Sequence, residues 1–189
     1  MRDNKEEDMY QREESDNLVE FLENSVSLFG DRPLFGTKNS QGVYEWVTYK
    51  EVAKRVDDLR SGLAQLGVEK DDAVGIIANN RVEWAVAAFA TYGRGGRFVP
   101  MYEAELEKIW EYIIRDSAIK VLFVSKPEIY ERVKGFTETI PTLERIFLIE
   151  GTGENTMKEL ERMGQSRSVP SVRPHSDDIA GLIYTSGTT

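Results

Sequence analysis

The last stretch of the sequence, residues 179–189, has the residue types of a phosphate-binding loop. An apolar run leads to a tyrosine and then to hydroxyl residues around a single glycine: Tyr184, Thr185, Ser186, Gly187, Thr188 and Thr189. A glycine lets the backbone approach a phosphate closely, and hydroxyls with successive N–H groups can donate to its oxygens. The G-x-x-x-x-G-K-[ST] spacing of a Walker A loop is absent. Composition alone favours a solvated chain end, so the decision depends on the rest of the chain.

Other polar residues have simpler explanations than a site. His175 is the sole histidine and lies in a Pro/Ser/Asp loop without a second His or Cys, which favours a solvated side chain over a metal ligand. Asp177 and Asp178 are adjacent acids before a strand, as in a turn. Residues 79–81 follow a strand and open a helix, where α/β folds often bind ligands, but a helix cap explains them as well. None of these groups is therefore chosen as a site.

The elements that must position the loop alternate between short β-rich runs and helical patterns. The expected strands are residues 73–77, 97–99, 121–124, 146–149 and 179–185. The expected helices are residues 81–92, 105–115, 127–134 and 156–163, with N-caps at Asn80 and Ser125 for the first and third. Residues 164–178 lack an apolar period and predict a loop. The alternation is typical of an α/β fold, with a largely parallel sheet flanked by helices.

Further elements precede this region. Asn17 and Glu20 are spaced as a capping box before an amphipathic helix. Residues 34–47 predict a small hairpin. Thr48 with Glu51 forms a second capping box, at the start of another helix. The acidic residues between 103 and 111 predict the solvated face and first turn of a helix. The aromatic side chains of the later helices are expected to pack in the core: Trp84, Phe89, Tyr92, Trp110 and Tyr112.

Charge and composition exclude several classes of function. The chain has 24 basic and 33 acidic residues, a net charge of -9, so nucleic acid is a poor partner. The absence of cysteine excludes disulfides and thiolate zinc sites and fits a reducing compartment. No apolar run is long enough to span a bilayer, and the charged start does not resemble a secretory signal. We expect a cytoplasmic protein whose residues 1–16 form a disordered, charged tail.

The hydroxyl-rich segment, preceded by Asp178, is similar to the phosphate-loop signature of the adenylate-forming (AMP-binding) superfamily, which includes acyl-CoA synthetases, luciferases and adenylation domains of peptide synthetases. The resemblance runs in the same order from about Asn17. Its further motifs are Thr48-Tyr49, Leu66-Gly67-Val68, Asp71-Asp72, Asn79-Asn80-Arg81-Val82-Glu83-Trp84, Phe98-Val99-Pro100-Met101-Tyr102 and Asp116-Ser117. The Asn-Arg-x-Glu-Trp and Val-Pro-x-Tyr combinations most resemble long-chain fatty acyl-CoA synthetases. The resemblance therefore implies the fold of their N-terminal subdomain.

The resemblance also implies a reaction in two steps. The carboxylate of a fatty acid attacks the α-phosphate of ATP and releases pyrophosphate, and CoA then displaces AMP to give a thioester. Thr185, Ser186, Gly187, Thr188 and Thr189 would contact the β- and γ-phosphates, with the Thr185 hydroxyl near Mg²⁺. No catalytic residue of the family falls within this chain.

Departures from the family pattern limit these expectations. The signature continues into a Gly and a Lys that the sequence does not reach, so we expect residues 17–189 to be a partial N-terminal AMP-binding domain that ends within the phosphate loop. Such a chain would be inactive alone, bind ATP weakly and self-associate through an exposed apolar face. Gly93-Arg94-Gly95-Gly96-Arg97 departs from the small apolar residue usual there, which affects local packing only.

Several alternatives stay open beside this reading. They are a fatty acyl-AMP ligase or another adenylate-forming enzyme, a non-catalytic binding or interaction module of the same fold, and a location peripheral to a membrane. A flavodoxin-like domain is disfavoured because its acidic triad or glycine fingerprint is missing.

Overall fold

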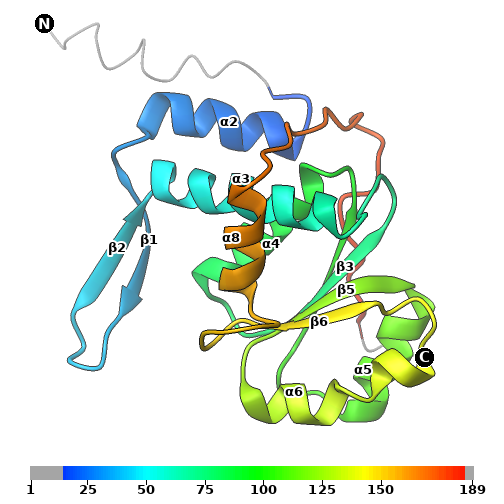
Figure 1. Ribbon diagram of the computed structural model, residues 1–189. Helices are drawn as coiled ribbons and strands as arrows, with labels where there is room; N and C mark the ends of the chain where they lie inside the picture. Colours follow the sequence, from blue (N-terminus) through cyan, green and yellow to red (C-terminus); the bar gives the residue numbers. More distant parts are fainter. Residues whose placement is uncertain (1–14, 186–189) are drawn as a thin grey trace, which may run out of the picture.

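A parallel sheet forms the centre of the computed structural model, which describes residues 15–185 (Figure 1). Its strands are β3 (Ala73–Ile77), β4 (Arg97–Met101), β5 (Ile119–Val124) and β6 (Arg145–Leu148), in the spatial order β4-β3-β5-β6. All of these pairings are parallel. Every residue of β3 is buried, as expected for a central strand covered on both faces. The predicted α/β fold with a parallel sheet and flanking helices is confirmed.

Helices cover both faces of this sheet, and alternate residues of each strand supply the two cores. On one face lie α3 (Tyr49–Gln65), α4 (Val82–Tyr92) and α8 (Met157–Gln165). On the other lie α5 (Glu107–Asp116), α6 (Pro127–Val133) and the short α7 (Phe136–Thr139), which the sequence analysis did not predict. The two faces follow from the period of two in a strand, so that neighbouring side chains of β3 enter different cores.

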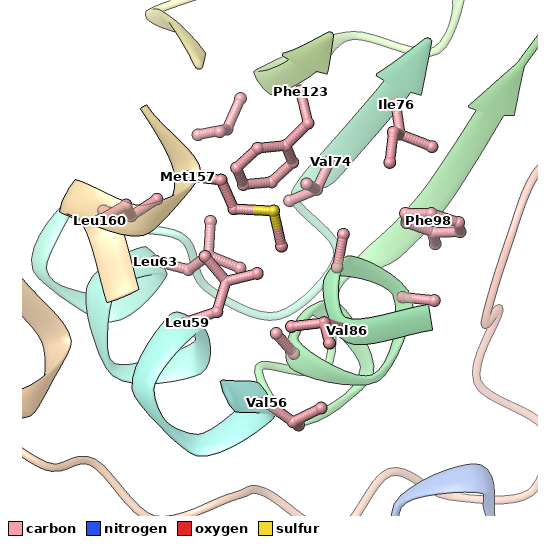
Figure 2. Packing of buried hydrophobic residues seen from close by; sticks show 14 of the residues in the cluster. Val56, Leu59, Leu63, Val74, Ile76, Val86, Phe98, Phe123, Met157 and Leu160 are labelled. Atoms are coloured by element: carbon pink, nitrogen blue, oxygen red, sulfur yellow. The ribbon is translucent and has the colours of Figure 1, made fainter. Parts of the chain in front are cut away.

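The first core is built where α3 and α8 meet the sheet (Figure 2). Leu59, Leu63 and Leu160 from these helices are fully buried together with Val74 of β3 and Phe123 of β5. Figure 2 shows the Met157 side chain between these helices and the strands. Burying one such aliphatic side chain contributes about 1.5–3 kcal/mol, so this layer fixes α3 and α8 on the sheet.

The predicted N-terminal elements are present and capped. The Asn17 side chain accepts the Glu20 N–H at the start of α2 (Leu18–Phe29). A hairpin of β1 (Pro33–Lys38) and β2 (Tyr44–Thr48) follows, and Figure 1 shows it beside the helices. Both hydrogen bonds of the Thr48 capping box are formed at the start of α3. Apart from Ser15 and Asp16, the predicted tail lies outside the described residues.

Two of the expected N-caps are wrong. The N-cap residues of α4 and α6 are Arg81 and Lys126, each one residue after the predicted cap, and neither side chain makes a capping hydrogen bond. Glu83, which would complete the box with Asn80, pairs with arginines instead.

The prediction of a strand at residues 179–185 is also wrong. Its described part forms a single parallel bridge, between Gly181 and Phe98 of β4. The Phe98 N–H donates to Ala180 O and the Leu182 N–H donates to Phe98 O. The next bond of this ladder would need an N–H from Pro100, which has none, so pairing stops there. The segment therefore lies along the sheet edge and leaves Ile183 78% exposed.

Candidate phosphate-binding site

Polar contacts hold residues 166–178, the segment that leads from α8 back to the sheet and to the candidate site. Arg60 donates to Val169 O, and the Val172 N–H donates to Gly93 O. Lys70 Nζ lies 2.9 Å from one carboxylate oxygen of Asp178, and this hydrogen bond lowers the pKa of Asp178. Asp178 also accepts the His175 N–H. The interpretation of Asp178 as a turn residue is thus confirmed.

Tyr184, the first residue of the hydroxyl-rich motif, is held against α5. Its hydroxyl donates to Asp116 Oδ2 at 2.6 Å, and its ring meets Tyr112 edge-on, with centroids 6.2 Å apart. Leu182 and Tyr184 pack against the core of this face, whereas Gly181, Ile183 and Thr185 are exposed. Partial burial is the larger cause and the Asp116 carboxylate the smaller one, and together they raise the pKa of Tyr184 to about 12. Tyr112, which was expected in the core, is 58% exposed and serves this contact instead.

Thr185 is the only predicted site residue within the described part of the chain. It is exposed, and its hydroxyl has no hydrogen-bond partner among residues 15–185. Ser186, Gly187, Thr188 and Thr189 lie outside the described residues. The chain passes β4 in the parallel direction, so Thr185 follows at the carboxyl end of the sheet, where open α/β sheets bind ligands.

The carboxylate of Glu103 lies at the carboxyl ends of β3 and β5. The Asn79 N–H donates to Glu103 Oε1 at 3.0 Å, and Lys126 Nζ lies 2.7 Å from Glu103 Oε2. Burial raises the pKa of Glu103, but the hydrogen bonds from Lys126 and Asn79 outweigh it, so that the pKa lies below its ordinary value. The prediction of a solvated Glu103 is therefore wrong, since its side chain is only 12% exposed.

An ion-pair network accounts for the Asn-Arg-x-Glu-Trp motif. Glu83 of α4 pairs with Arg81 at 2.8 Å and with Arg55 of α3 at 3.1 Å, and Arg55 pairs in turn with Glu161 of α8. These hydrogen bonds and charges lower the pKa of Glu83, although burial acts in the opposite direction. Trp84 packs edge-on against Phe98, with ring centroids 5.0 Å apart. Through Glu83 and Trp84 this motif joins α4 to α3 and to β4.

The described part of the chain does not assemble a cluster of metal-binding side chains. Residues 15–185 contain no group of three His, Cys, Asp or Glu side chains that could hold a metal ion. His175 is exposed and its ring lies 3.5 Å from Asp177 only, in agreement with the solvated loop predicted for it. The same residues include no helix long and apolar enough to cross a membrane.

Two grooves occur near α2, away from Thr185. One, of about 330 Å³, lies between the start of α2 and residues 174–180. The other, of about 310 Å³, lies between α2, α3 and α4 and includes Arg60. Thr185 lines neither groove.

Comparisons with known proteins agree with this geometry. The chain is 30% identical to "Long-chain-fatty-acid--CoA ligase 6" of Rattus norvegicus over 91% of its length, and 33% identical to "Long-chain-fatty-acid--CoA ligase FadD15" of Mycobacterium bovis over 78%. These matches cover 27% and 26% of the relatives, so the chain spans about a quarter of their length.

Among solved structures, a long-chain-fatty-acid-CoA ligase (FadD1) from Archaeoglobus fulgidus superposes with a TM-score of 0.76 at 25% identity. This match covers 91% of the chain and 35% of that structure. Residues 22–189 match the family described as "AMP-binding enzyme". Since that match includes the parallel sheet, the segment along β4 and the hydroxyl-rich motif, the chain belongs to the AMP-binding enzyme family.

Proposed function

We propose that the polypeptide containing this chain is an AMP-forming acyl-CoA ligase, and that residues 17–189 supply part of its ATP-binding domain. The observation that carries the proposal is the route of residues 180–185. They follow β4 in the parallel direction and bring the Thr185 hydroxyl, without a partner among the described residues, to the carboxyl end of the sheet. Family membership supports ATP as the nucleotide.

In this proposal the residues from Thr185 onward bind the β- and γ-phosphates of ATP. Hydroxyl and backbone donors would hold the departing pyrophosphate in place while a carboxylate attacks the α-phosphate. Catalysis by positioning and by stabilising charge on the phosphates needs no nucleophile from the protein. The net charge of -9 does not oppose such binding, because a phosphate site is built from local donors.

Mg²⁺ fits the residues that are present. It prefers hard oxygen ligands and in nucleotide sites takes most of them from phosphates and water. An exposed threonine hydroxyl without a described partner meets that requirement, and a cluster of protein carboxylates is not needed. The bound ion would neutralise charge that develops on the phosphates.

The acid and the acceptor are inferred from the names of the relatives. Two of them, from a mammal and a mycobacterium, are called long-chain-fatty-acid–CoA ligases and match over most of this chain. We therefore propose a long-chain fatty acid as the substrate and CoA as the thiol acceptor. We also propose a cytoplasmic location, with peripheral contact to a membrane where the fatty acid is supplied from lipid.

The test is an exchange of labelled pyrophosphate into ATP, measured with a panel of carboxylic acids on the protein expressed from its full natural reading frame. Exchange that depends on a long-chain acid is expected. Thr185→Val should raise the KM for ATP about ten-fold, as expected for one lost hydrogen bond to a charged group. Thr152→Val is the matched control, because Thr152 is also exposed but lies in the loop after β6.

The alternatives predict different outcomes of the same assay. A fatty acyl-AMP ligase would exchange pyrophosphate but would not consume CoA. A non-catalytic module of the same fold would give no exchange with any acid, and this result would overturn the proposal.

A further inference from the structure

The hydroxyl-rich motif is reached through a segment with few backbone anchors. Beside β4, the described part of this segment makes only the Phe98–Ala180 and Leu182–Phe98 hydrogen bonds. The ladder cannot continue past Leu182, because Pro100 offers no N–H to Leu182 O. Thr185 lies three residues beyond the last of these backbone bonds. The backbone pairing on β4 alone therefore leaves the position of Thr185 loosely defined.

A side chain supplies the contact that the backbone cannot. The Tyr184 hydroxyl reaches Asp116 at the end of α5, and the Tyr112 ring packs edge-on against the Tyr184 ring. A hydrogen bond to an ionised acceptor is among the stronger side-chain bonds. A tyrosine is also stiff, with few rotatable bonds, so that fixing its hydroxyl fixes its backbone. The bond thus joins the residue directly before Thr185 to a helix packed on the sheet.

The position of Asp116 indicates that its hydrogen bond to Tyr184 does not serve to stabilise α5. Asp116 is the last residue of α5, where the negative end of the helix dipole disfavours a carboxylate by about 0.3–1 kcal/mol. Within residues 15–185, Tyr184 supplies the only hydrogen bond to this carboxylate. The Tyr184 hydroxyl is thus bound by a carboxylate that is unfavourable for its own helix.

We propose that Tyr184 is a positioning residue for nucleotide binding: its hydrogen bond to Asp116 fixes the position from which Thr185 approaches the phosphates. The effect on ATP binding rests on the proposed function, whereas the anchoring of the segment by the Tyr184–Asp116 hydrogen bond does not depend on it.

The test compares Tyr184→Phe and Asp116→Ala with Tyr112→Phe, which removes a hydroxyl from the same aromatic contact but leaves the Tyr184–Asp116 bond intact. The first readout is hydrogen exchange at the Leu182 amide, which donates to Phe98 O. Loss of the anchor should speed this exchange about ten-fold in Tyr184→Phe and Asp116→Ala. The double variant should be no faster than either single variant, because both remove one bond. Tyr112→Phe should exchange like the wild type.

The second readout separates positioning from stability. In the protein from the full natural reading frame, Tyr184→Phe should raise the KM for ATP about ten-fold, with kcat, the KM for the acid and Tm close to wild type. Asp116→Ala should show the same rise in KM while its Tm stays level or increases, because the carboxylate leaves the helix end. Unchanged exchange at Leu182 would overturn the anchor. Faster exchange with an unchanged KM for ATP would overturn its role in nucleotide binding. If the wild type turns over no ATP, the proposed function fails, while the exchange data still decide on the anchor.

Discussion

Replacing Gly164 by alanine should destabilise the fold strongly, because α3 and α8 touch there through their backbones. A Cβ on Gly164 would overlap the Asp58 carbonyl oxygen and lie 2.7 Å from the Gly62 nitrogen. Neither atom can rotate away as the end of a side chain could. The helices must therefore separate, and the fully buried Leu63 and Leu160 would lose contacts across the gap.

The magnitude follows from opposing effects. Alanine is better than glycine inside a helix by about 1 kcal/mol. Against this, inserting a methyl group into a packed interface costs about 1–3 kcal/mol, and a gap of 0.5–1 Å forfeits about a quarter to a half of each dispersion contact across it. We expect a net loss near 3 kcal/mol, which lowers Tm by about 6–12 °C in a domain of this size.

The assay is thermal and urea unfolding of the chain followed by circular dichroism. Gly135→Ala is the control, because a Cβ there meets no atom within 4 Å. It should leave Tm unchanged or raise it slightly. Gly62→Ala should be destabilising as well, because its Cβ would overlap the Leu160 carbonyl oxygen. The double variant should lose less stability than the sum of the two single variants, since the first methyl group already separates the helices. A Gly164→Ala chain as stable as the wild type would show that α3 and α8 can accommodate a methyl group at this contact.

Three further predictions concern charge and surface. Arg55→Ala should cost about 1–3 kcal/mol in urea unfolding, because Glu161 loses its partner while only 11% exposed. Arg162→Ala, which removes a side chain that is 70% exposed, should leave the stability close to that of the wild type, and equal effects of the two variants would contradict this. The pKa of Glu83 is lowered from 4.5, so its contribution to stability is present above that pH and is lost as the pH falls through the folded value. Glu83→Gln should therefore flatten the acid side of the stability curve, and an unchanged curve would count against it. The open edge beside Ile183 should make the chain self-associate, and light scattering that shows a monomer at high concentration would exclude this.

Local signals in the sequence were sufficient for most of the fold. The buried run of β3 and the capping box at Thr48 depend on residues close in sequence, and the structure confirms both. The end of the ladder beside β4 was predictable in principle, because Pro100 lacks the N–H that the next bond requires. The strand predicted over residues 179–185 rested on apolar residues alone and left Pro100 out of consideration.

What could not be predicted depends on contacts between distant residues. The role of Glu103 requires Asn79 and Lys126, which other strands bring to it. Asp116 and Tyr184 are far apart in sequence, and no local pattern links an acid at a helix end to a tyrosine hydroxyl. Asp116 was noticed only as part of a family motif, and Tyr184 only as the start of the hydroxyl-rich segment. The candidate site was therefore predicted by residue type, whereas its anchoring required the structure.

Product analysis distinguishes an AMP-forming acyl-CoA ligase from other enzymes that consume ATP. The protein from the full natural reading frame is incubated with ATP, Mg²⁺, CoA and a long-chain fatty acid, and the nucleotides and acyl products are separated by chromatography. The account predicts AMP, pyrophosphate and acyl-CoA in equal amounts, with none of them formed when the acid is omitted. ADP with phosphate as the products, or nucleotide turnover that does not depend on any acid, would contradict it.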